Sequence, residues 1–205
     1  MRTITVMNQK GGVGKTTTAV NLAAGLAARG RQVCLIDLDP QGHASMHLGV
    51  EPSGSTPTIY QVFTGEKTLA EVRQLVAPNL WVAPANTELA AIELELVDVP
   101  DRELILRGAM QQFVQTQPMD YIILDCPPGL SELSDGVIAM SEALRVFAVM
   151  VPAVSGGSEG VYLKAELSPV TTAVNVAGAV AAVGVALLAF AICSSAAGRS
   201  RSRTK

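Results

Sequence analysis

Short apolar runs alternate along the chain with longer segments in which apolar residues recur every three or four positions. The apolar runs, which predict buried strands, lie at residues 3–7, 31–36, 80–83, 121–124 and 145–152. The periodic segments, which predict helices, lie at residues 16–29, 58–63, 87–96, 100–117 and 137–144. Because strands that alternate with helices imply a mainly parallel sheet flanked by helices, we expect an α/β fold.

A glycine-rich segment, Lys10-Gly11-Gly12-Val13-Gly14-Lys15-Thr16-Thr17, joins the first predicted strand to the first predicted helix. It is a deviant form of the phosphate-loop pattern G-x-x-x-x-G-K-S/T, because Gln9 stands at the first glycine position. Glycines let backbone N–H groups turn toward a polyphosphate, Lys15 can neutralise the outer phosphates, and Thr16 can offer its hydroxyl to Mg²⁺. The N-terminus of the following helix also favours an anion, so this segment predicts a nucleotide site.

Acidic residues follow two other predicted strands at the point where each strand ends. One strand leads into Asp37-Leu38-Asp39-Pro40-Gln41-Gly42, and another leads into Asp125-Cys126-Pro127-Pro128. Two carboxylates separated by one residue at a strand end point the same way, so both can face a metal-bound phosphate. A lone acid at the end of the other strand can hold Mg²⁺ through water. Since ligands of open α/β sheets bind at the carboxyl ends of strands, the three segments support one another.

Together these segments resemble the ParA/Soj branch of the ParA/MinD partition ATPases, and the resemblance extends over about residues 1–151. It implies a P-loop NTPase that binds ATP and Mg²⁺ and hydrolyses ATP to ADP and phosphate. The residues that it assigns to nucleotide binding are Gly11, Gly12, Val13, Gly14, Lys15, Thr16 and Thr17. Those that it assigns to the metal shell are Thr16, Asp37 and Asp125. Its two catalytic residues are Lys10, which reaches across a nucleotide-sandwich dimer to the partner's phosphates, and Asp39, which positions or activates the attacking water.

The resemblance also implies a biological function. It predicts a cytoplasmic, nucleoid-associated ATPase that segregates chromosomes or plasmids, forms an ATP-dependent homodimer and works with a centromere-binding partner protein. Two alternatives stay open at this point. One is a nucleotide-binding remnant that does not cycle, and the other is a membrane-associated positioning ATPase of the MinD type.

The resemblance stops near Val151, where the composition also changes. We therefore expect a P-loop ATPase domain over residues 1–152, with a sheet truncated at its C-terminal side, then an irregular linker over 153–169, an apolar segment over 170–193 and a basic tail over 194–205. The apolar segment admits three readings: a membrane anchor, a buried core helix, or a frameshifted or recombined product. A single span would put the basic tail across the membrane from the ATPase, against the usual preference of such charges for the cytoplasmic side.

Charge and the remaining reactive residues add little further chemistry. The net charge of −3 argues against strong nucleic-acid binding by the domain as a whole, and the basic surface that family members use is not recognisable, so non-specific DNA is a doubtful partner. Any residual affinity is assigned to the tail residues Arg199, Arg201, Arg203 and Lys205. The three cysteines have no metal-ligand spacing, and neither histidine is given a metal role.

Overall fold

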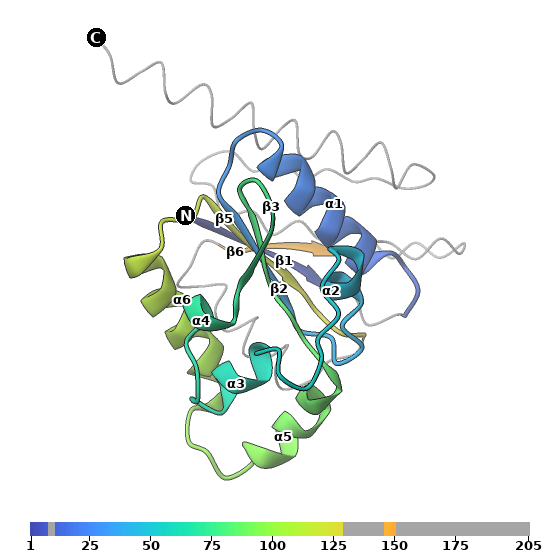
Figure 1. Ribbon diagram of the computed structural model, residues 1–205. Helices are drawn as coiled ribbons and strands as arrows, with labels where there is room; N and C mark the ends of the chain where they lie inside the picture. Colours follow the sequence, from blue (N-terminus) through green and yellow to red (C-terminus); the bar gives the residue numbers. More distant parts are fainter. Residues whose placement is uncertain (8–10, 129–145, 151–205) are drawn as a thin grey trace.

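A six-stranded sheet forms the centre of the computed structural model, which describes residues 1–7 and 11–128 and the backbone of residues 146–150 (Figure 1). The strands are β1 (Arg2–Met7), β2 (Val33–Asp37), β3 (Gln74–Ala77), β4 (Leu80–Ala83), β5 (Tyr121–Asp125) and β6 (Val146–Met150). The α-helices are α1 (Lys15–Ala27), α2 (His43–His47), α3 (Ile59–Phe63), α4 (Leu69–Val72), α5 (Ile92–Glu95) and α6 (Ile105–Thr116). Two 3₁₀ turns, η1 (Thr87–Ala91) and η2 (Arg102–Leu104), precede α5 and α6.

The sheet has the strand order β3-β4-β2-β5-β1-β6. All neighbouring pairs are parallel except β3 and β4, which are antiparallel. Strand β5 lies between β1 and β2, so the strand that comes late in the chain separates the two that come first. The predicted α/β fold with a mainly parallel sheet is confirmed.

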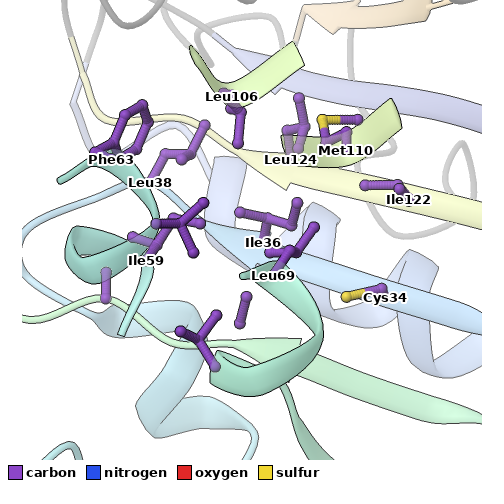
Figure 2. Packing of buried hydrophobic residues seen from close by; sticks show 14 of the residues in the cluster. Cys34, Ile36, Leu38, Ile59, Phe63, Leu69, Leu106, Met110, Ile122 and Leu124 are labelled. Carbon is purple, nitrogen blue, oxygen red and sulfur yellow. The ribbon is translucent and has the colours of Figure 1, made fainter. Parts of the chain in front are cut away.

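Helices cover both faces of the sheet, with α1 on one face and α3, α4 and α6 on the other (Figure 1). The central strands β2 and β5 are buried at every position, as expected for parallel strands that are covered on both faces. Alternate residues face opposite layers: Leu35 and Ile123 pack with α1, whereas Ile36 and Ile122 pack with the other helices (Figure 2).

The strands predicted from apolar runs are present, but two of the predicted helices begin or end elsewhere. The helix expected over residues 100–117 cannot include Asp101, which adopts a left-handed conformation with φ 55°; the 3₁₀ turn η2 follows, and the α-helix starts only at Ile105. The helix expected over 87–96 is split into the 3₁₀ turn η1 and the four residues of α5. The helix expected over 137–144 lies outside the described residues.

Strand β3 was not predicted from the sequence, and it forms one edge of the sheet. Its four residues alternate between half-buried and exposed, which gives too short a pattern to recognise. Arg73, just before the strand, holds it in place from the helical side. Its guanidinium lies 5.2 Å from the centre of the Trp81 ring and 5.0 Å from that of Phe113, and it donates to Gln117 Oε1 at 2.7 Å. Trp81 therefore acts as a packing residue.

No helix in the described parts of the chain is long and apolar enough to cross a bilayer. The linker, apolar segment and basic tail expected over residues 153–205 lie outside the described residues, so the three readings of the apolar segment stay predictions.

The buried layer between β2 and the α3–α6 side yields a stability prediction. Ile36 is fully buried in this layer, so Ile36→Ala removes apolar contacts and leaves a cavity. The free energy of unfolding should fall by about 2–5 kcal/mol, as measured by urea denaturation of the full chain. Leu94→Ala is the control, because that side chain is 79% exposed and its truncation should change stability by less than about 0.5 kcal/mol. Equal losses in the two variants would contradict this assignment of the core.

Candidate functional site

The glycine-rich loop leads into the N-terminus of α1 with its backbone exposed. Gly12 and Gly14 adopt φ values of 70° and 89°, which side-chain-bearing residues rarely adopt. A Cβ added at either position would meet no atom within 4 Å, so backbone conformation rather than crowding requires glycine here. No side chain among the described residues caps α1, although the N–H of Thr18 bonds to the Gly14 carbonyl at 2.9 Å. An uncapped helix start beside an open loop suits an anion.

The first residues of α1 face the carboxyl end of β5. Lys15 is buried, with 7% of its surface exposed, and its charge lowers the pKa of Asp125. Thr16 is half-buried, and its hydroxyl also favours the charged form of Asp125. The next residue, Thr17, is exposed, and Val13 in the loop is half-buried. Lys10 lies outside the described residues, so its expected role stays a prediction.

Asp125 is a fully buried carboxylate, and neither of its oxygens has a hydrogen-bond partner of ordinary geometry among the described residues. The pKa of Asp125 is raised to about 7, with burial as the largest cause; the nearby Asp37 and Asp39 add to the rise, while the approach of the Thr16 hydroxyl and the Lys15 charge limit it. Unused carboxylate oxygens beside a threonine hydroxyl form a donor set that fits a hard cation such as Mg²⁺.

Asp37 lies directly opposite Asp125 in the neighbouring strand, but unlike Asp125 it accepts several hydrogen bonds from the protein. Its Oδ1 accepts from the Asp39 N–H at 3.1 Å, and its Oδ2 accepts from both the Ser45 N–H at 2.9 Å and the Ser45 hydroxyl at 2.7 Å. Burial raises the pKa of Asp37, and the Ser45 hydrogen bonds limit that rise. The alternation along each strand directs both aspartates toward the α1 face, on which the glycine-rich loop leads into that helix.

Asp39 lies in a tight turn just beyond β2 and is half-buried. Its Oδ1 accepts from the Gln41 N–H at 2.9 Å, and its carbonyl accepts from the Gly42 N–H at 2.8 Å. Gly42 has φ 63°, and a Cβ there would approach the Ala85 carbonyl oxygen to 2.9 Å. This turn therefore requires glycine both for its backbone conformation and for its contact with Ala85.

Ser45 is the buried polar residue at this site that sequence reasoning missed. The only signal available was a serine eight positions after an acid, which occurs in many chains. Within the described residues, no group of three or more His, Cys, Asp or Glu side chains could hold a metal ion. That finding is compatible with Mg²⁺, which is usually bound by one or two protein oxygens together with water and phosphate. Cys34 and Cys126 are free, and burial raises the pKa of both thiols to about 12.

The raised pKa of Asp125 predicts a pH dependence of stability in the protein without metal or nucleotide. Between about pH 4 and pH 7 the folded protein holds a proton that the unfolded chain has released, so the stability contributed by Asp125 falls as pH rises through this range. Over this pH range the free energy of unfolding of the wild-type chain should fall, relative to that of Asp125→Asn, by at most about 4 kcal/mol. This limit corresponds to a pKa difference of about three units between the folded and unfolded chains. Urea denaturation at several pH values measures the difference, and parallel stability profiles would contradict the assignment.

Comparisons with known proteins agree with the fold and with the sequence segments at this site. A family model described as an AAA domain matches residues 1–158. The chromosome partitioning protein ParA of Caulobacter vibrioides is 42% identical over 148 residues, which cover 72% of this chain and 55% of that protein. The sporulation initiation inhibitor protein Soj of Bacillus subtilis is 40% identical over 144 residues, which cover 70% of this chain and 56% of that protein. The chain thus spans about half the length of these relatives.

Among solved structures, cobyrinic acid a,c-diamide synthase from Mycobacterium smegmatis, with a bound ATP analogue and magnesium, superposes with a TM-score of 0.68. The two are 32% identical in sequence, and the match covers 76% of this chain and 62% of the synthase. Because the family model covers most of the chain, this protein belongs to the AAA-domain family, and its N-terminal part is similar to ParA and Soj, which are both at least 40% identical to it.

Proposed function

We propose that this chain binds Mg²⁺-ATP at the carboxyl ends of β2 and β5, and that it hydrolyses the nucleotide. The observation that carries the proposal is the buried Asp125 carboxylate, whose oxygens have no hydrogen-bond partner of ordinary geometry among the described residues, only the approach of the Thr16 hydroxyl. A buried anion of this kind is costly unless a cation joins it. The uncapped N-terminus of α1 and the open glycine-rich loop offer backbone N–H groups that can bind the phosphates accompanying such a cation.

The proposed roles follow from the contacts of each residue. Lys15 neutralises the outer phosphates, the N–H groups of the glycine-rich loop and of the start of α1 bind phosphate oxygens, and Thr16 and Asp125 hold the metal directly or through water. Bound Mg²⁺ would neutralise charge that develops on the phosphates during transfer. Asp37, whose oxygens already accept three protein hydrogen bonds, orients the turn that follows β2 rather than binding the metal as its main ligand.

Asp39 is proposed to orient the water that attacks the terminal phosphate. Its turn begins where β2 ends, at the same edge of the sheet as Asp125, and its charge raises the pKa of Asp125. Its Oδ2 makes none of the hydrogen bonds described above, so one carboxylate oxygen can contact a water molecule. Attack by that water would release ADP and phosphate.

The similarity to ParA and Soj supports a role in chromosome or plasmid partitioning in the cytoplasm, on the nucleoid. An ATP-dependent homodimer, in which Lys10 enters the partner's site, and a centromere-binding partner protein belong to this proposal. A second candidate, which the sequence left open, is a nucleotide-binding module that does not cycle. Sedimentation with and without ATP separates the two, because only the first predicts a dimer that forms with nucleotide.

The phosphate-binding role of Lys15 can be tested directly. Lys15→Ala removes a charge that backbone N–H groups cannot replace, so ATP binding measured by calorimetry should weaken by at least ~1.5 kcal/mol. Lys67→Ala, which removes the same charge at an exposed position beyond α3, should bind ATP as the unaltered chain does. Equal affinity of the Lys15 variant and the unaltered chain would rule out the proposed site.

The role of Asp39 predicts a separation of binding from turnover. Asp39→Asn keeps an oxygen that can accept from the Gln41 N–H, so the turn and ATP affinity should be preserved while hydrolysis falls at least about a hundredfold. Phosphate release by the unaltered chain is measured first, since its absence would itself refute the hydrolysis proposal. A variant that hydrolyses ATP at the original rate would show that Asp39 does not act on water.

A further inference from the structure

The turn that carries Asp39 contacts the segment that follows β4, which is distant in sequence. β2 and β4 are parallel neighbours, with Ile36 opposite Ala83, so the residues that follow the two strands lie next to each other. Ala85, two residues beyond β4, donates its N–H to the Ser45 Oγ at 3.2 Å. The Ser45 hydroxyl in turn donates to Asp37 Oδ2 at 2.7 Å. One buried hydroxyl therefore links the end of β4 to the Asp37 carboxylate.

Ala85 makes a second contact with the same turn. Its carbonyl oxygen lies so close to Gly42 that a Cβ on the glycine would approach it to 2.9 Å. The preceding residue, Pro84, accepts a hydrogen bond from the Ile59 N–H at 2.8 Å, which ties this segment to the start of α3. The turn thus rests against a backbone segment that is itself held by a helix.

The Ser45 hydrogen bonds are unusual for a serine within a helix. Such hydroxyls commonly bond to a carbonyl one turn earlier in their own helix. In α2 the hydroxyl instead donates to a carboxylate outside the helix and accepts from a residue 40 positions away. Because Ser45 and Asp37 are both fully buried, water cannot readily replace either bond.

We infer that Ser45 is a positioning residue of the nucleotide site, and the inference rests on the proposed ATPase function. Its hydroxyl fixes the Asp37 carboxylate, which receives the Asp39 N–H, and it holds this arrangement against Ala85. The direction of the Asp39 side chain toward the proposed water therefore depends on a hydroxyl that does not touch the nucleotide.

The test uses three variants of the full chain. Ser45→Ala removes both hydrogen bonds of the hydroxyl, and Ser45→Cys removes most of their strength while filling nearly the same volume. Both should keep ATP affinity within about twofold and lower turnover about tenfold to a hundredfold, the equivalent of a lost hydrogen bond to a charged group. Ser45→Thr retains the hydroxyl and should restore most of the turnover. Met46→Ala, at the exposed neighbouring position, is the control and should behave as the unaltered chain does.

Amide hydrogen exchange provides a readout that does not require turnover. In Ser45→Ala and Ser45→Cys the amides of Ala85, Asp39 and Gln41 should exchange at least about tenfold faster, whereas in Ser45→Thr they should stay protected. If the unaltered chain hydrolyses no ATP, the proposed function fails, and the exchange result still decides whether Ser45 holds the turn. Unchanged exchange in the Ala variant would overturn the inference. Equal loss of ATP binding in all three Ser45 variants would also overturn it, because it would indicate a general folding role.

Discussion

The cost of burying two carboxylates side by side governs the arrangement of this site. Asp37 and Asp125 lie opposite each other at the ends of adjacent strands, and both are inaccessible to solvent. Burial raises the pKa of each, so each charged form needs compensation from its surroundings. Asp37 obtains it from three protein donors, whereas Asp125 has only the approach of the Thr16 hydroxyl and the Lys15 charge, with no hydrogen bond of ordinary geometry among the described residues. Because of this difference, Asp37 has a structural role, whereas Asp125 is suited to bind a cation.

The bonds that compensate Asp37 also shape the chain around it. Its donors belong to Asp39, in the turn between β2 and α2, and to Ser45, within α2. Satisfying one buried charge therefore closes the turn, and the position of Asp39 follows from that closure. Gly42 permits the closed form because it adopts a left-handed conformation and leaves room for the Ala85 carbonyl. In this part of the molecule, the same hydrogen bonds stabilise the buried charge and determine the conformation of the loop.

Much of the fold and the principal site segments could be predicted from the sequence, because buried parallel strands form continuous apolar runs and because glycines and acids follow them directly. Features that depend on distant contacts could not be predicted. The importance of Ser45 arises from Ala85, 40 residues away, and the late start of α6 follows from the left-handed Asp101 and the 3₁₀ turn η2 after it. Strand β3 is stabilised by Arg73 between two aromatic rings, which no local pattern indicates. Lys10 stays a prediction, because it lies outside the described residues.

The central place of β5 has a consequence for how the chain acquires its structure. β1 and β2 do not pair with each other, and each meets β5, which the chain supplies much later. Even the nearer contact, between Gln32 and Asp120, joins residues 88 positions apart. Such long-range pairing slows folding, because a large loop must close before the contacts that compensate for its entropy can form. During synthesis the glycine-rich loop and Asp37 therefore emerge well before Asp125, and the completed site can assemble only after β5 has inserted between its two neighbours.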